Sequence, residues 1–385
     1  MTTRRRFITT TAAISAVERL PAATSKTPSI YSHLGIRPVI NGIGTVTIFG
    51  GSIMPPEVTQ AMEEAAQYFV PLPELQRQAG ARIAELVGVP AAMVTAGAAS
   101  AITVGTAACI TRGDPAKLAQ LPDVTGMKYE VIQQKSHRCG YEAQILLTGA
   151  KIVRVETREE LDRAINDRTA MMFFLNKADP EGRIRRDEWI RVAKERGVPT
   201  FNDAAADVPP PERLSAYVKE GFDLVAFSGG KGLLGPQCTG LLLGGKEWIE
   251  AGMPAISPHG GIGRGMKVGK EEIAGLLAAV ERYLKVDHDA ERRELERRAA
   301  YIIDFLAKSP LKAKLDVPEI ANHVPHVQID WEGKLPATEV VRQLLEGDPP
   351  IAVSQRGERG LTVSVWMMRP GEHRIVAKRL AEVFA

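Results

Sequence analysis

Asp223-Leu-Val-Ala-Phe-Ser-Gly-Gly-Lys-Gly-Leu-Leu-Gly-Pro-Gln237 is the stretch that decides the fold of this 385-residue chain. It begins as an apolar strand, and Lys231 follows that strand between glycines, where the backbone carries little side-chain bulk. Ser228 lies three residues earlier, and a second apolar run follows at 241–243. A lysine at such a strand end can form a Schiff base with a flat aldehyde cofactor, with the serine hydroxyl near the cofactor's phosphate. The alternative is a solvated loop lysine, and the rest of the chain decides between them.

Composition is that of a soluble enzyme-sized protein, with 44% hydrophobic and 25% charged residues. No apolar run approaches the ~18 residues that a membrane span needs. The three cysteines, Cys109, Cys139 and Cys238, predict neither a disulfide framework nor a zinc site, so we expect no metal. Residues 1–28 hold five basic and one acidic residue, which leaves 44 basic and 45 acidic residues in the body. A nearly neutral body argues against nucleic acid as a partner.

The composition of the N-terminal 28 residues indicates a segment separate from the body of the protein. Arg4-Arg-Arg-Phe-Ile8 resembles the core of a twin-arginine export signal, 12–17 is a short apolar region, and Pro21-Ala-Ala23 offers small residues for cleavage. We therefore expect a periplasmic protein. The alternative is a disordered basic tail on a cytoplasmic protein, because Glu18 and Arg19 cut the apolar region short.

Strand-like and helix-like patterns alternate along the body, which predicts an α/β fold with a mainly parallel sheet. The predicted strands are 91–95, 129–133, 151–155, 170–175, 198–202, 224–227 and 240–243, and the helices between them include 158–165, 186–196 and 211–219. A long charged helix over 270–307, strands over 326–331 and 361–366, and a closing helix over 374–384 predict a smaller C-terminal α/β domain. We expect a tail over 1–28, an N-terminal segment over 29–50 that crosses to the main domain, a large domain over 51–260 and a small domain over 261–385.

Three further groups fall at predicted strand ends, where open α/β sheets bind their ligands. Gly97-Ala98-Ala99-Ser100 opens a helix after a strand, so its backbone N–H groups can hold a phosphate, although a tight packing turn is equally compatible. Asp203 ends a strand, where a protonated pyridine nitrogen would offset the cost of burying its carboxylate; an N-cap is the alternative. His137 could lie over a cofactor ring or assist proton transfer, or it could be a hydrogen-bonded structural histidine.

This order of turn, histidine, aspartate and Ser-x-x-Lys resembles pyridoxal 5′-phosphate enzymes of the aspartate aminotransferase fold (fold type I). The sequences of 31–45, 51–58, 75–88, 202–206 and 227–231 are similar to the family of bacterial selenocysteine synthase and D-glucosaminate-6-phosphate ammonia-lyase. The similarity covers most of the chain from about residue 31 to the C-terminus. The lyase branch fits better, because the transfer-RNA branch is expected to carry an extra N-terminal domain and a basic binding surface, whereas this chain offers an export-like tail and a nearly neutral body.

The resemblance implies a lyase that uses pyridoxal phosphate for α,β-elimination with ammonia release from a small amino acid or amino sugar acid. Lys231 would be the Schiff-base lysine and general base, and Asp203 would keep the ring protonated. Arg369, Arg356 and Arg264 are candidate ligands for substrate, with surface positions as the alternative. The resemblance also implies a homodimer or larger assembly with active sites at the subunit interface. Selenium transfer, racemisation, aldol cleavage and transamination remain alternatives on the same fold.

Overall fold

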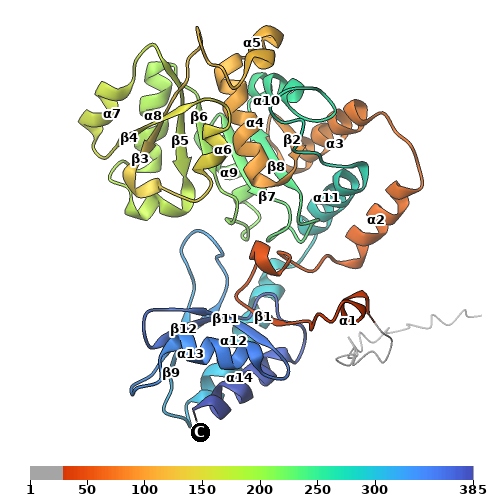
Figure 1. Ribbon diagram of the computed structural model, residues 1–385, viewed down its shortest axis with the longest axis vertical. Coiled ribbons are helices and arrows are strands. Elements are labelled where there is room, and N and C mark those ends of the chain that lie inside the picture. Colours follow the sequence, from red (N-terminus) through yellow and green to blue (C-terminus); the bar gives the residue numbers. More distant parts are fainter. Residues whose placement is uncertain (1–28, 385) are drawn as a thin grey trace, which may run out of the picture.

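The computed structural model describes residues 29–384, which form two α/β domains (Figure 1). The large domain lies at the top of the view and contains a seven-stranded sheet. The small domain lies below and contains a five-stranded sheet. The tail for which export was predicted, residues 1–28, lies outside the described residues.

The large sheet has the strand order β2-β8-β7-β6-β5-β3-β4. Only β8 runs antiparallel to its neighbours; the other six strands are parallel, as the alternating sequence pattern predicts. The strands are β2 (Ala91–Thr95), β3 (Glu130–Gln134), β4 (Lys151–Val155), β5 (Thr169–Leu175), β6 (Thr200–Asp203), β7 (Leu224–Ser228) and β8 (Gly240–Gly244).

Helices cover both faces of this sheet, because its central strands are apolar on both faces. The helices of this domain are α2 (Pro56–Ala66), α3 (Leu72–Val87), α4 (Gly97–Thr111), α5 (Pro115–Gln120), α6 (Glu142–Leu146), α7 (Arg158–Ala164), α8 (Arg186–Arg196), α9 (Arg213–Glu220), α10 (Lys246–Gly252) and α11 (Lys270–Tyr283). Helix α4 is buried almost all round. Gly105 lets α4 approach β6, because a Cβ at this position would lie 2.4 Å from the ring of Phe201.

The small sheet has the order β1-β11-β12-β10-β9, and its strands are β1 (Ile40–Gly42), β9 (Lys312–Asp316), β10 (His326–Asp330), β11 (Ile351–Gln355) and β12 (Gly360–Ser364). Its helices are α12 (His288–Leu306), α13 (Ala337–Glu346) and α14 (Glu372–Val383). β1 pairs parallel with β11, and the short helix α1 (Ile30–His33) lies beside this domain in Figure 1. The N-terminal segment therefore begins on the small domain before the chain crosses to the large one.

The structure differs from the sequence-based prediction after residue 260. The single helix predicted over 270–307 is two helices, because Asp287 caps the start of α12 by accepting a hydrogen bond from the Ala290 N–H at 2.8 Å. Helix α11 packs on α2 and α3, and its Ile273 and Leu276 belong to the core of the large domain. The large domain therefore extends past the boundary expected at residue 260.

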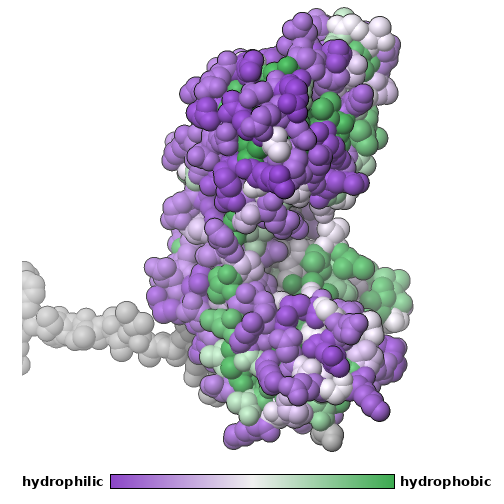
Figure 2. Space-filling model, turned by 90° about the vertical axis from the view of Figure 1, so that its left-hand side faces the viewer, coloured by the Kyte–Doolittle hydropathy of each residue, from purple (hydrophilic) through white to green (hydrophobic). Residues whose placement is uncertain are grey.

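Within residues 29–384, no helix is both long and apolar enough to span a bilayer, and no group of three or more potential metal-ligating side chains occurs. Figure 2 shows the two domains as an upper and a lower lobe, with hydrophilic residues over most of this face. Its largest apolar area borders the junction of the two lobes.

Candidate functional site

The carboxyl ends of the parallel strands meet at one edge of the large sheet, where side chains of different chemistry gather. β6 ends at Asp203, and β7 ends at Ser228, three residues before Lys231. A cleft of about 480 Å³ opens at this edge, and both Asp203 and Lys231 line it. The structure thus brings together the two residues on which the sequence-based hypothesis depends.

Lys231 is a partly buried amine in an unusual setting. Its side chain makes no hydrogen bond or ion pair with any residue of 29–384. Burial lowers its pKa, while the carboxylates of Asp203 and Asp207 act in the opposite direction and the charge of Lys177 lowers it further. A lysine whose pKa is lowered is more often in the neutral form that attacks a carbonyl group.

Asp203 is buried, with only 5% of its surface exposed. Its Oδ1 accepts a hydrogen bond from the Ala205 N–H at 3.1 Å, and its Oδ2 has no hydrogen-bond partner among residues 29–384. Burial raises its pKa, and the positive charges of Lys231 and Lys177 partly offset this. A buried carboxyl with an unused oxygen at a cleft can take a cationic N–H donor as its partner.

The start of α4 carries the phosphate-binding features that the sequence predicts. Gly97 has φ +83°, a conformation that favours glycine. Gly97, Ala98, Ala99 and Ser100 form the first turn of this 15-residue helix, where N–H groups lack intrahelical partners. The Ser100 hydroxyl is buried and has no hydrogen-bond partner in the part of the chain that the structure describes. Free N–H groups and an unpaired buried hydroxyl at a helix N-terminus suit a phosphate.

Ser228 lies close to this turn because of the strand register. Gly240 of β8 pairs with Ser228 of β7 on one side and with Thr95 of β2 on the other. A Cβ on Gly240 would lie 2.4 Å from the carbonyl carbon of Gly97, so β8 passes directly against the α4 turn. The serine and the helix start can therefore contact one ligand.

The position of His137 contradicts the role considered for it at the cofactor ring. Its side chain is fully buried, and its Nδ1 accepts a hydrogen bond from the Leu175 N–H at 3.1 Å. Its ring packs edge-on against Phe174, and burial lowers its pKa to about 4. The cleft is lined instead by Cys139 and Tyr141 of the same loop. His137 is thus a neutral structural histidine, which was the alternative left open.

None of the three candidate arginines lines the cleft of this chain. Arg356 is paired with Asp330 in the small domain, so its charge is already satisfied. Arg264 is exposed in the connector before α11. Arg369 is exposed beyond the end of β12, and its guanidinium has no hydrogen-bond or ion-pair partner among residues 29–384.

The cleft also contains residues that the sequence reasoning missed. Lys177 and Asp207 line it, as does the segment Pro318–Asn322 of the small domain. Lys177 follows the end of β5. The rule that open α/β sheets bind ligands at the carboxyl ends of their strands, which singled out Asp203, therefore also predicts Lys177. The small-domain segment had no such signal, because its contact with the large domain joins residues more than 100 positions apart.

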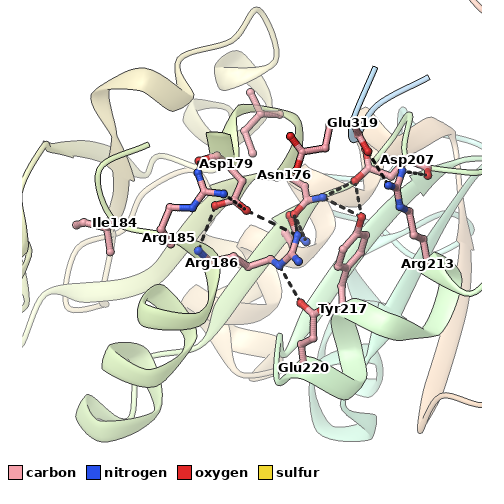
Figure 3. A network of polar contacts seen from close by, with 12 residues as sticks. Asn176, Asp179, Ile184, Arg185, Arg186, Asp207, Arg213, Tyr217, Glu220 and Glu319 are labelled. Atoms are coloured by element: carbon pink, nitrogen blue, oxygen red, sulfur yellow. Dashed lines mark hydrogen bonds and ion pairs between the residues drawn. The ribbon is translucent and has the colours of Figure 1, made fainter. Parts of the chain in front are cut away.

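Arg213 joins this small-domain segment to the large domain (Figure 3). Its guanidinium donates to the backbone carbonyl of Asp207 at 3.1 Å, to that of Glu319 at 2.8 Å and to that of Ile320. The Asn322 N–H donates to the Ala206 carbonyl at 2.8 Å. Residues 206–213, which follow Asp203, therefore hold the Pro318–Asn322 segment against the large-domain side of the cleft.

A strand-end lysine, a buried carboxyl and a helix N-terminus at one edge of this sheet define the class of pyridoxal-phosphate enzymes of fold type I. Serine palmitoyltransferase of Sphingomonas wittichii has the same fold, with a TM-score of 0.61 at 15% identity over 89% of this chain and 86% of that chain. A solved serine palmitoyltransferase structure contains pyridoxal phosphate.

Comparison with known sequences is more specific. D-glucosaminate-6-phosphate ammonia lyase of Salmonella typhimurium is 32% identical over 93% of this chain and 98% of its own length. A solved structure of an enzyme with that name gives a TM-score of 0.80 at 31% identity, over 93% of this chain and 98% of that chain. A 5'-C-glycyluridine monooxygenase-decarboxylase of Streptomyces is 32% identical over 84% of this chain and 78% of its own length.

The family model described as SelA, L-seryl-tRNA selenium transferase, matches residues 154–299. The chain therefore belongs to the family of pyridoxal-phosphate enzymes that includes D-glucosaminate-6-phosphate ammonia lyase and the selenium transferases. The family resemblance and the fold class predicted from the sequence are confirmed.

Proposed function

We propose that this protein is a pyridoxal-phosphate lyase that carries out α,β-elimination, with release of ammonia, on a small amino acid or an amino sugar acid. The observation that carries the proposal is that buried Asp203 and Lys231, an amine with no hydrogen-bond or ion-pair partner within residues 29–384, line one cleft. Similarity to an ammonia lyase over nearly the whole chain supports the reaction class. It also supports an amino sugar acid as the kind of substrate.

The residues present fit the cofactor. The N–H groups of Gly97–Ser100 and the hydroxyls of Ser100 and Ser228 would hold its phosphate. The buried Ser100 Oγ, which no group of residues 29–384 hydrogen-bonds, supports this. Asp203 would hold the ring nitrogen in its protonated form, and Nζ of Lys231 would hold the aldehyde carbon. When bound, pyridoxal phosphate supplies an electron sink next to the substrate's Cα.

The chain's own residues would then do the following. Nζ of Lys231, once the substrate's amino group has displaced it from the aldehyde carbon, accepts the proton from Cα, and its lowered pKa suits this role. Lys177, an exposed cation that lines the cleft, attracts the substrate's carboxylate. Arg369 and Arg264 remain candidates for contacts with the distal part of the substrate or with a neighbouring subunit. The segment Pro318–Asn322 covers one side of the cleft and limits the size of the substrate.

The test is an assay of the purified protein with pyridoxal phosphate and a panel of 2-amino-3-hydroxy acids that includes serine and D-glucosaminate with and without a 6-phosphate. We expect ammonia and a 2-oxo acid in equal amounts without any added acceptor. A strict requirement for an oxo-acid acceptor would instead identify an aminotransferase. Racemisation, aldol cleavage or selenium transfer without ammonia would point to the other reactions known for this fold.

A homodimer is part of the proposal. Large apolar side chains are exposed on the N-terminal segment and before α3, including Ile48 at 83% and Phe69 at 104%. Large apolar side chains exposed to this degree are typical of protein–protein interfaces, so a second copy is the expected cover. Sedimentation of the holoprotein should give at least twice the mass of 41.8 kDa, and a monomer at micromolar concentration would contradict it.

Export by the twin-arginine route remains our proposal for residues 1–28. The motivating feature is the Arg4-Arg5-Arg6 run followed by a short apolar stretch. We expect protein from the native host's periplasm to begin near residue 24. An intact N-terminus on protein confined to the cytoplasm would refute export.

A further inference from the structure

Asp207 is a buried carboxyl group in the cleft. The mechanism proposed above uses Lys231 and Asp203 but gives Asp207 no role. Only 1% of its surface is exposed, yet it lines the same cleft as Lys231. Its Oδ2 accepts hydrogen bonds from Asn176 Nδ2 at 2.6 Å and from the Tyr217 hydroxyl at 3.0 Å (Figure 3). Its Oδ1 has no hydrogen-bond partner among residues 29–384.

The two donors to Oδ2 are themselves fixed. Asn176 Oδ1 accepts from the Arg186 guanidinium at 3.1 Å, so the amide of Asn176 must direct its NH₂ group toward Asp207. Arg186 pairs with Glu220 at 2.8 Å and lies over the ring of Tyr217. Since Oδ2 is fully engaged as an acceptor, the proton of the acid form must lie on Oδ1.

The charges around Asp207 allow both the protonated and the ionised form of its carboxyl group. Burial raises its pKa to about 6, against the hydrogen bonds from Asn176 and Tyr217. The neighbouring carboxylate of Asp203 raises it further, and the guanidinium of Arg213 lowers it. Across the cleft, its carboxylate in turn raises the pKa of Lys231. A carboxyl with these neighbours can give up a proton near neutral pH.

We propose that Asp207 is the proton donor to a hydroxyl leaving group on Cβ of the substrate, an inference that rests on the proposed lyase function. In this step the Cα–H bond breaks and its proton goes to Nζ of Lys231. The Cα=Cβ double bond forms as the Cβ–O bond breaks. The departing oxygen keeps the bonding electron pair and takes the Oδ1 proton, so that water leaves and Asp207 becomes a carboxylate. Hydrolysis of the resulting enamine consumes one water and yields the 2-oxo acid and ammonia.

The experiment compares two leaving groups in the wild type and in Asp207→Asn. The first probe is the 2-amino-3-hydroxy acid of the panel above on which the wild type is most active, and the second is 3-chloroalanine. Because hydroxide needs a proton to leave, we expect kcat/KM for the hydroxy acid to fall about 10²-fold or more. Because chloride leaves without a proton, we expect initial rates with 3-chloroalanine to change little.

Two further variants separate proton donation from a structural role. Asp179→Asn makes the same change at a buried aspartate that pairs with Arg185 and Arg186 but does not line the cleft, so the ratio of the two rates should stay at the wild-type value. Tyr217→Phe removes a hydrogen bond to the carboxylate and should raise the pKa of Asp207. The hydroxy-acid rate, which needs the acid form, should then persist to higher pH, while the rate with 3-chloroalanine should not shift.

Equal losses with both probes, or none with either, would overturn the assignment of Asp207 while leaving the lyase function intact. Absence of ammonia from every hydroxy acid with the wild-type holoprotein would refute the lyase function and this proposal with it.

Discussion

Turnover should be abolished in Lys231→Ala, with a loss of about 10⁴-fold or more, since this change removes both the covalent anchor of the cofactor and the general base. Lys231 is the cleft lysine at the end of β7, and it has no hydrogen-bond or ion-pair partner among residues 29–384. The measurement is ammonia release together with the visible absorbance that pyridoxal phosphate acquires when it is linked to a lysine. Both should be lost in the variant, and the cofactor should wash out on gel filtration.

The matched control for this prediction is Lys177→Ala. Lys177 lines the same cleft, but it is exposed and follows a different strand. This variant should keep the absorbance and show a raised KM if Lys177 attracts the substrate's carboxylate. Retention of the wild-type spectrum by Lys231→Ala, or its loss in Lys177→Ala, would show that the wrong lysine has been assigned.

The strands of the large sheet could be predicted from the sequence because buried parallel strands are short continuous apolar runs. β2 and β4 begin and end at the predicted residues, and β7 differs from its prediction by one residue. Parallel strands also place their carboxyl ends at one edge of the sheet. Asp203 and Lys231 could therefore be assigned to one site before any contact was known.

The side on which a loop side chain lies could not be predicted. His137 and Cys139 are two residues apart after the same strand, yet His137 packs against Phe174 and Cys139 lines the cleft. A short 3-10 turn over Lys135–His137 decides this, and no periodicity describes such a turn. The chemistry of an imidazole favours a role at the cofactor ring for His137. Its burial depends instead on contacts with distant parts of the sequence.

The contribution of the small domain depends on contacts that no local pattern encodes. Arg213 reaches the carbonyl of Ile320 across 107 residues of sequence. By contrast, the break between α11 and α12 had a local signal: Asp287 precedes the helix that it caps. The charged pattern continues through the break and predicts a single helix, although Asp287 marks the start of a second one.

The second large effect is expected in Asp203→Asn, which should lower kcat by roughly 10²–10⁴-fold, because removing one charge of a buried ion pair costs about 3–5 kcal/mol. Asp203 is buried at the end of β6, and burial raises its pKa in the protein without cofactor. A protonated ring nitrogen would reverse that shift, so the carboxylate should ionise as the cofactor binds. An asparagine of the same shape cannot offer a negative charge, and the ring would lose its power to withdraw electrons.

The readouts for Asp203→Asn differ from those for Lys231→Ala. The absorbance of lysine-linked cofactor should persist, because Lys231 is intact, whereas the dissociation constant for pyridoxal phosphate should rise. Asp223→Asn is the matched control: Asp223 precedes β7 at the opposite edge of the sheet and accepts hydrogen bonds from Thr200 at 2.8 Å. That variant should lower the melting temperature and leave kcat of the folded protein unchanged. Wild-type kcat in Asp203→Asn would mean that the electron sink works without this carboxylate, and the assignment of Asp203 would fail.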